Sequence, residues 1–398
     1  MSDNSRIEWT DATWNPVTGC SKVSEGCRNC YAERVSHCSG TTSKPWTYAN
    51  AAKNVKLHPE RLDQPIRWRR PRRIFVNSMS DLFHEQVPDS FLDDVFGIML
   101  ACEIYDNRNH TFQILTKRPE RMKAYLSAEP AVLVKRWARA ANGIAHCMDE
   151  DTLVSDLVYG RCARLWSAEG RALSDHKAWS HCESVFPLPN VWLGVSAENQ
   201  RAAEERVPFL LQTPAAVRFL SCEPLLGSLD LGKWIGTYYC SACGFRGFDG
   251  GEADPENEES GDQCPRCGAD GWYFTHAESH GALDEETRSP ISWIVAGGES
   301  GPNARPMHPD WVRSSRDQCA EAGVPFLFKQ WGEWFPRDQW KHNPDLILPD
   351  DDAAYRETSR THLFEDMSGS FPVHRVGKKA AGRVLDGRTW NEMPAVTR

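Results

Sequence analysis

Residues 73–81 read RIFVNSMSD, a short apolar run that ends in a group of polar side chains. After a looser first run at 6–14, the same pattern recurs at residues 111–118, 191–199, 217–224, 292–300 and 324–331. Most of these runs are continuous rather than alternating, which is typical of strands buried on both faces of a parallel sheet. The polar ends of such strands would lie together at one edge of the sheet.

Segments with helical spacing separate the runs. Residues 89–102 and 309–322 carry apolar side chains at helical intervals, and residues 119–126 begin with proline at the first helical position. Alternating strands and helices predict an α/β fold, a partial (β/α) barrel over residues 1–334, with 335–398 as a C-terminal extension. In a barrel the C-terminal ends of the strands share the face that usually carries the chemistry.

The composition indicates a cytoplasmic protein that binds metal. The chain of 398 residues has a formal net charge of -9, which disfavours coating of nucleic acid by bulk electrostatics. No apolar run is long enough for a signal peptide or a membrane span, so we expect a cytoplasmic protein without membrane contact. A reducing cytoplasm disfavours disulfides, and metal ligation is therefore the better interpretation of the 14 cysteines.

Two stretches, residues 139–188 and 234–290, interrupt the alternation and are interpreted as insertions. The second contains two Cys-x-x-Cys pairs, formed by Cys240, Cys243, Cys264 and Cys267. Four thiolates at this spacing predict a structural zinc ribbon, whereas a redox dithiol would explain one pair but not two. The first insertion has cysteines and histidines in no clean pattern, and no role is predicted for it.

A different cysteine pattern follows the first apolar run. Cys20, Cys27 and Cys30 have the spacing Cys-x6-Cys-x2-Cys. Three thiolates suit a [4Fe-4S] cluster whose fourth iron stays open for a small molecule. They also suit a zinc site that His37 or Cys38 completes. The spacing alone leaves both interpretations open.

The blocks around these motifs resemble a radical-SAM-like family of phage and bacterial proteins. The matching blocks are residues 7–16, 19–32, 75–83, 113–122, 192–199, 221–226, 297–301 and 328–332. The resemblance implies a partial barrel of the radical-SAM type that binds a [4Fe-4S] cluster on Cys20, Cys27 and Cys30 together with S-adenosylmethionine (SAM). One electron from the cluster would cleave SAM, and the resulting 5′-deoxyadenosyl radical would abstract hydrogen from a substrate.

Two features depart from the commonest radical-SAM pattern. The first cysteine interval is three residues longer than in Cys-x3-Cys-x2-Cys, and Asn29 stands where an aromatic residue usually precedes the third cysteine.

The resemblance also implies roles for polar residues at the strand ends. The SAM amino group would be held by residues that follow the second strand: Asn77, Ser78, Ser80 and Asp81. Ribose hydroxyls would bind Glu198 and Glu223, and adenine or substrate would approach Gly297 and Gly298. The predicted catalytic residues are Lys117, Glu223 and Lys329, the lysines binding an anionic group or donating a proton. An internal ion pair between a lysine and one of these glutamates is the plainer alternative.

The substrate is the least determined part of this interpretation. Occurrence of the family in phages and the basic stretch RWRRPRR at 67–73 suggest a nucleotide or nucleic acid, although a solvated basic loop explains that stretch as well. An electron-donor protein would be a further partner, and the oligomeric state is not predicted. Two alternatives remain open: a zinc-only module that binds nucleic acid or protein, and a metal-dependent hydrolase on the barrel that does not use SAM.

Overall fold

The computed structural model describes residues 5, 7–104, 109–144, 185–235, 291–343, 360–366 and 369–394, together with short strands at 237–240, 246–247 and 272–275. Statements below refer to these residues.

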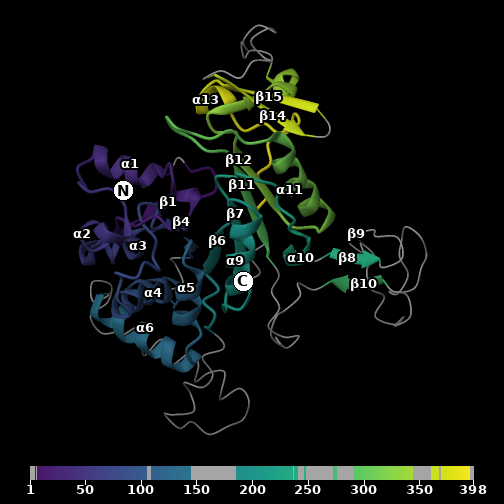
Figure 1. The fold of residues 1–398 in the computed structure, drawn as a ribbon. Coiled ribbons are helices and arrows are strands. Elements are labelled where there is room, and N and C mark those ends of the chain that lie inside the picture. The colour runs from purple at the N-terminus through teal and green to yellow at the C-terminus, as the bar shows by residue number, and fades with distance from the viewer. Residues whose placement is uncertain are drawn as a thin grey trace. The chain divides into compact units, whose positions relative to one another are not determined.

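A seven-stranded sheet forms the centre of the fold (Figure 1). Its strands, in order across the sheet, are β1 (Ala12–Trp14), β4 (Arg73–Val76), β5 (Thr111–Thr116), β6 (Val191–Ser196), β7 (Val217–Cys222), β11 (Trp293–Gly297) and β12 (Phe326–Gln330). The order across the sheet is the order along the chain, and the paired strands run parallel. Every residue of β6, β7 and β11 is buried, which explains their continuous apolar sequences. The predicted α/β class is therefore confirmed, as a parallel half-barrel sheet.

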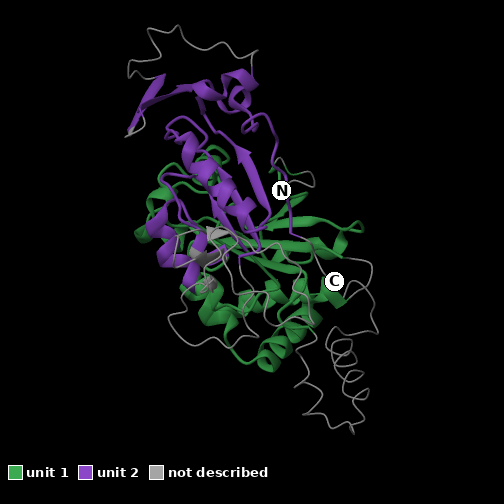
Figure 2. Cartoon of the chain, turned by 90° about the vertical axis from the view of Figure 1, so that its right-hand side faces the viewer, with its two compact units in different colours: residues 1–196, 209–218, 398 green, residues 197–208, 219–397 purple. Residues whose placement is uncertain are grey.

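The chain divides into two compact units, coloured green and purple in Figure 2. The first unit comprises residues 1–196 and 209–218 with residue 398, and the second comprises residues 197–208 and 219–397. Strands β1, β4, β5 and β6 lie in the first unit, whereas β11, β12 and most of β7 lie in the second.

The described helices of the first unit lie along the chain between its strands, and most contribute side chains to its core. They are α1 (Tyr31–Cys38), α2 (Ala51–Asn54), α3 (Gln64–Arg67), α4 (Asp89–Ile104), α5 (Pro119–Leu126) and α6 (Pro130–Ile144). Helices α4 and α6 lie side by side, and the rings of Phe96 and Trp137 stack between them with centroids 5.1 Å apart. A short ladder of β2 (Val17–Thr18) and β3 (Lys56–Leu57), with the 3-10 turns Glu25–Cys27, Tyr48–Asn50 and Pro59–Arg61, completes this unit.

The remaining elements flank the last strands of the sheet. They are α9 (Gln200–Leu211), α10 (Gly232–Ile235), α11 (Pro309–Glu321), the 3-10 helix Arg337–His342, α13 (Lys378–Ala381) and a second sheet of β13 (Trp334–Pro336), β15 (Gly369–Arg375) and β14 (Thr361–Asp366). Helix α11 starts where Nδ1 of His308 accepts a hydrogen bond from the Asp310 N–H, and Gly323, with φ +64°, follows its end. The sequence signals for this helix are thus confirmed.

The two predicted insertions are described only in part. Residues 145–184 of the first lie outside the described residues. The second contributes a three-stranded antiparallel sheet of β10 (Trp272–Thr275), β8 (Thr237–Cys240) and β9 (Arg246–Gly247). Of the cysteines predicted to bind zinc, Cys240 is described by its backbone at the end of β8, and the others lie outside the described residues: Cys243, Cys264 and Cys267.

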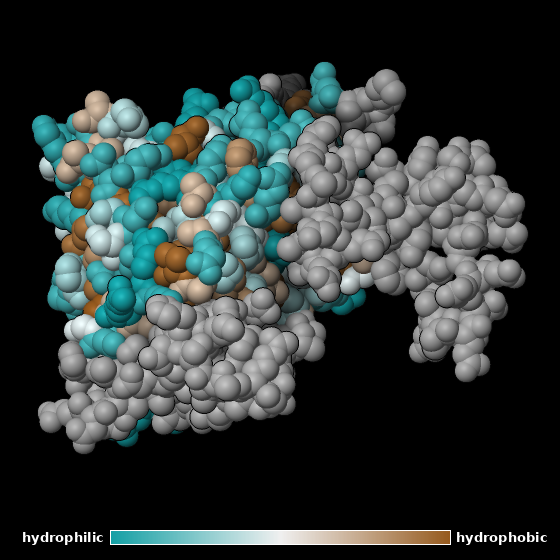
Figure 3. All heavy atoms as spheres, turned by 90° about the horizontal axis from the view of Figure 1, so that it is seen from below, coloured by the Kyte–Doolittle hydropathy of each residue, from teal (hydrophilic) through white to brown (hydrophobic). Residues whose placement is uncertain are grey.

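Hydrophilic side chains predominate on the described surface seen in Figure 3, and apolar ones are scattered among them. Within the described residues, no helix combines the length and the apolar character needed to cross a bilayer.

Candidate functional site

The segment Gly19–Cys30, here called the cysteine loop, is anchored at the C-terminal end of β4. Gly19 has φ +81°, and a Cβ at this position would lie 2.0 Å from the carbonyl oxygen of Asn54, so only glycine fits there. The Gly19 N–H donates to the Met79 carbonyl at 3.0 Å, and Gly19 forms a parallel bridge with Ser80. The loop therefore begins at the edge where the sequence predicted polar strand ends.

All three cysteines of the loop are half-buried free thiols. Burial raises the pKa of the Cys20 thiol to about 12, and burial also raises the pKa of Cys30. Negative charge on Cys27 also raises the pKa of Cys20 and that of Cys30. Deprotonation of this set needs compensating positive charge or hydrogen-bond donors.

Groups that favour the thiolate form lie near Cys30. It directly precedes α1, and the backbone N–H groups of Glu33 and Ala32 in the first turn of that helix lower the pKa of Cys30, which opposes the effect of burial, although the Cys30 side chain makes no capping hydrogen bond. The positive charge of Lys117 also lowers the pKa of Cys30. No ion pair of the Lys117 ammonium occurs within the described part of the chain.

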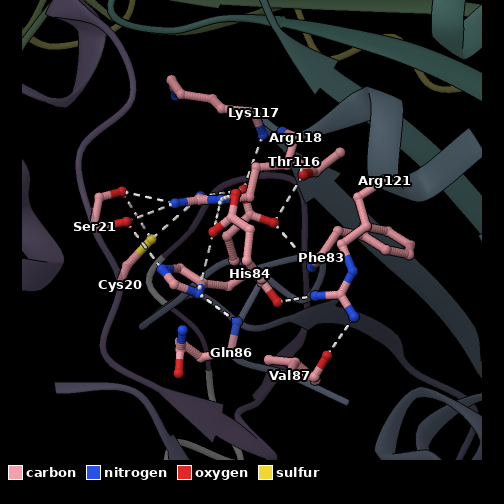
Figure 4. A network of polar contacts seen from close by, with 12 residues as sticks. Cys20, Ser21, Phe83, His84, Gln86, Val87, Thr116, Lys117, Arg118 and Arg121 are labelled. Carbon is pink, nitrogen blue, oxygen red and sulfur yellow. Dashed lines mark hydrogen bonds and ion pairs between the residues drawn. The ribbon is translucent and has the colours of Figure 1, made fainter. Parts of the chain in front are cut away.

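Arg118 provides the corresponding donor for Cys20 (Figure 4). Its Nη1 donates to the Cys20 sulfur at 3.5 Å, and its Nη2 donates to the carbonyl and hydroxyl oxygens of Ser21 at 2.9 and 3.0 Å. Nη1 also contacts Asp81 at 3.3 Å, and Nε donates to Glu85 at 3.1 Å. The side chain of Arg118 is only 6% exposed, so this guanidinium is held inside the protein by two carboxylates and the cysteine loop.

Asp81 holds the ends of β4 and β5 together. Its Oδ1 accepts hydrogen bonds from the Phe83 N–H at 3.0 Å and from the Thr116 hydroxyl at 2.8 Å. Its Oδ2 accepts from the Lys117 N–H at 3.0 Å and from Arg118. Both oxygens of the carboxylate predicted to bind SAM are thus engaged by the protein itself.

His84 lies beneath the cysteine loop as a neutral imidazole. Its Nδ1 accepts from the Gln86 N–H at 3.1 Å, which places the ring proton on Nε2, 2.9 Å from the Ser21 hydroxyl. Burial, together with the positive charge of Arg118, lowers the pKa of His84 to about 4. This histidine therefore orients Ser21 without adding charge at neutral pH.

The other residues predicted to bind SAM connect the turn after β4 to the segment after β1. The Ser78 hydroxyl donates to Oδ1 of Asn15 at 3.2 Å, and the Ser80 hydroxyl donates to the Val17 carbonyl at 2.9 Å. Asn77, at φ 60°, accepts a hydrogen bond from the Val17 N–H at 3.2 Å. Its Nδ2 is buried and has no hydrogen-bond partner among the described residues.

The second unit brings another predicted group together at the ends of β7, β11 and β12. The Lys329 ammonium lies 3.2 Å from the Glu223 carboxylate, and both side chains are partly exposed. A Cβ on Gly297 would lie 2.8 Å from Oε1 of Glu223 and 3.3 Å from the Gln330 carbonyl oxygen. Lys329 thus forms the internal ion pair that the sequence offered as the plainer alternative.

Two further predictions in this unit also have an internal explanation. Glu198 is 1% exposed and forms a bidentate ion pair with Arg206 of α9, with oxygen–nitrogen distances of 2.7 and 3.2 Å. A Cβ on Gly298 would lie 2.0 Å from the Trp331 carbonyl oxygen. Glycine at this position is therefore required by packing of the chain against itself.

The donors proposed to complete a zinc site lie away from the start of α1. Seven residues separate Cys30 from His37, which is about 10 Å along a helix at 1.5 Å per residue. The Nε2 of His37 contacts the Lys44 carbonyl at 3.1 Å, and Cys38 is exposed. Among the described residues, no three His, Cys, Asp or Glu side chains are grouped around a position for one ion.

Sequence reasoning gave no role to several residues that organise these sites: Arg118, Ser21, His84 and Arg206. Arg118 was visible as the last residue before the proline that starts α5, in the block QILTKRPERM at 113–122. Its contacts with Cys20, 98 positions away in sequence, carry no local signal.

Comparison with protein families identifies one match. The model of the family described as "Protein of unknown function (DUF5131)" matches residues 4–394. Neither the curated proteins nor the solved structures contain a match to this chain.

Proposed function

Because this chain belongs to the DUF5131 family, whose function is unknown, we propose a function from its own residues: it is a radical SAM enzyme with a [4Fe-4S] cluster on the cysteine loop. The observation that supports this most is the set of donors around the sulfurs. Arg118 donates to Cys20, and the N–H groups in the first turn of α1 lower the pKa of Cys30. Cluster thiolates carry negative charge, and hydrogen bonds of this kind stabilise them.

The chain would contribute three thiolates and leave one iron for SAM. When bound, such a cluster supplies the single electron that cleaves SAM, and hydrogen abstraction from a substrate follows. A single zinc ion would require its thiolates to lie about 3.8 Å apart, at 2.3 Å from a common centre. Cluster ligands lie further apart because each binds a different iron, and this suits a loop in which Cys27 ends a 3-10 turn and Cys30 directly precedes α1.

Asn77 is the residue of the turn after β4 that we propose to contact SAM directly. The sequence assigned this turn to the SAM amino group, but the unpartnered atom of Asn77 among the described residues is the donor Nδ2, which would bind the SAM carboxylate instead. Ser78, Ser80 and Asp81 would act by holding this turn against the cysteine loop.

Lys117 and the Glu223–Lys329 pair are the proposed catalytic residues. The Lys117 ammonium, near Cys30, would bind an anionic group or donate a proton to a product. Glu223 would accept hydrogen bonds from ribose hydroxyls, with the Lys329 ammonium 3.2 Å away as its ion-pair partner. The proposed substrate class is a nucleotide or nucleic acid, and the electron would come from a donor protein.

Two further parts of the proposal concern the rest of the chain. The cysteines at 240, 243, 264 and 267 would hold a structural zinc ion. All seven cysteines with described side chains are free thiols, which accords with a reducing, cytoplasmic location.

The test is anaerobic purification and reconstitution of the full chain with iron and sulfide. We expect a brown protein with about four irons bound by the cysteine loop, and 5′-deoxyadenosine after addition of SAM and dithionite. A colourless protein that retains only zinc would favour a zinc-only binding module. A brown protein that forms no 5′-deoxyadenosine with any reductant would favour chemistry without SAM.

A further inference from the structure

Nη1 of Arg118 contacts the Cys20 sulfur, and three cysteine ligands could hold a cluster without such a contact. All three of its guanidinium nitrogens are engaged, and one of them faces a proposed cluster ligand. Two carboxylates, Asp81 and Glu85, hold the group in place, and the side chain of Asp81 is only 8% exposed. A buried arginine held this firmly cannot turn away from the sulfur.

The contact becomes stronger when Cys20 loses its proton. In the metal-free protein the Cys20 thiol donates to the Ser21 carbonyl at 3.4 Å while its sulfur accepts from Nη1 of Arg118 at 3.5 Å. A metal-bound thiolate can only accept, so the first bond is lost and the second becomes charge-assisted. Arg118 is therefore arranged for the deprotonated form of Cys20.

We propose that Arg118 is a positioning residue that fixes Cys20 as a ligand and raises the reduction potential of the bound cluster. This inference rests on the proposed function. Reduction adds one electron, from dithionite in the test below, and takes the cluster from [4Fe-4S]2+ to [4Fe-4S]1+. No bond breaks and the guanidinium keeps all of its protons. A fixed positive charge beside a ligand sulfur stabilises the reduced form more than the oxidised form.

The chain offers a matched control in Arg121, on α5. Its guanidinium donates to the carbonyl oxygens of His84 and Val87 and pairs with Asp89 at 3.0 Å. It thus ties down the same 84–87 segment as Arg118 and lies near it (Figure 4). None of its hydrogen bonds within the described residues goes to a cysteine. Replacement of Arg121 therefore measures how far a loosened 84–87 segment changes the reduction potential. Replacement of Arg118 loosens the same segment and also removes the contact with the Cys20 sulfur.

The experiment is a redox titration of the reconstituted full chain, followed by visible absorbance and by the electron paramagnetic resonance signal of the reduced cluster. In Arg118→Gln the ratio of reduced to oxidised cluster at a fixed potential should fall about tenfold, a shift of about 59 mV for one electron. Arg118→Lys keeps the positive charge but lacks the planar guanidinium. Its ratio of reduced to oxidised cluster should lie between those of Arg118→Gln and the wild type. Arg121→Gln should leave the ratio unchanged within about twofold.

A second variant keeps the inference testable if Arg118→Gln does not load a cluster. Glu85→Gln keeps Arg118 and removes one of its carboxylates, a partly exposed one that contacts no cysteine within the described residues. The potential should then shift in the positive direction, opposite to Arg118→Gln. Equal potentials in wild type, Arg118→Gln and Glu85→Gln, with the brown cluster present in all, would overturn the role of Arg118 alone. Absence of a cluster from the wild type would overturn the proposed function as well.

Discussion

The ammonium of Lys329 lies 3.2 Å from each carboxylate oxygen of Glu223, across the ends of β12 and β7. Gly297 of β11 lies between these strands, and a side chain there would meet Glu223 at 2.8 Å. The pair is partly exposed, at 21% for the lysine and 14% for the glutamate side chain, so both groups remain accessible to a ligand. An ion pair with this accessibility can serve the fold, a ligand or both.

Measurement of SAM binding separates these roles. If Glu223 accepts hydrogen bonds from ribose, Glu223→Gln should weaken SAM binding about tenfold, equivalent to about 1.4 kcal/mol. Lys329→Met should weaken it by less than about threefold, because the carboxylate remains. Equilibrium dialysis of SAM against the reconstituted protein measures both values. An equal loss of SAM affinity in the two variants would show that the ion pair stabilises the fold and that Glu223 does not bind ribose.

The cysteine loop and the end of α1 allow a direct test of the cluster ligands. Cys27→Ala should abolish the brown chromophore and lower bound iron, because two thiolates do not hold the cluster firmly. Cys38→Ala is the matched control, since Cys38 is an exposed free thiol at the last residue of α1. Visible absorbance and iron analysis follow both variants. Loss of the chromophore in Cys38→Ala or His37→Ala would instead show that the cluster has a fourth protein ligand and no iron left open for SAM.

The sequence predicted the sheet well because its strands are buried on both faces. Every residue of the runs 191–196 and 217–222 is buried, so neither run needs polar side chains on a solvent-facing side. A continuous apolar sequence is therefore a direct sign of such a strand. The end of the sheet that carries polar residues was also predictable, because the chain must leave each parallel strand at the same edge. Only the loosely defined first run was too long: β1 covers Ala12–Trp14.

The partners of the polar residues were not predictable in the same way. Asp81 and Glu198 are carboxylates at strand ends, where ligands often bind. In the structure, however, their oxygens accept hydrogen bonds from Arg118 and Arg206, respectively. Such pairings depend on distances that exist only after folding, and periodicity carries no information on them. The alternative of an internal ion pair was correct for Lys329, whereas Lys117 has no such pair within the described residues.

Gly298 provides a test of close packing between β11 and the segment after β12. Gly298→Ala would place a Cβ 2.0 Å from the Trp331 carbonyl oxygen, a backbone atom that cannot rotate away. We expect the free energy of unfolding to fall by about 3 kcal/mol, in the range for overpacking in a core. Gly143→Ala is the control, because nothing lies within 4 Å of its Cβ position in α6. Denaturant unfolding that shows equal stability for both variants would contradict this packing.

His84 predicts how the metal-free protein responds to acid. Its pKa is lowered from 6.5 to about 4, chiefly by burial, so the unfolded chain binds a proton in this interval that the folded chain does not. The stability due to neutral His84 is therefore complete above pH 6.5 and is lost as the pH falls toward 4. In His84→Gln, which stays neutral, that loss should be absent. The free energy of unfolding of both proteins is measured in urea across this pH range. The difference between the two proteins removes the contribution of the carboxylates that they share. Curves that stay parallel from pH 4 to pH 7 would show that His84 takes up its proton at the same pH in the folded and the unfolded protein, and in the protonated form the Gln86 N–H could not donate to its Nδ1.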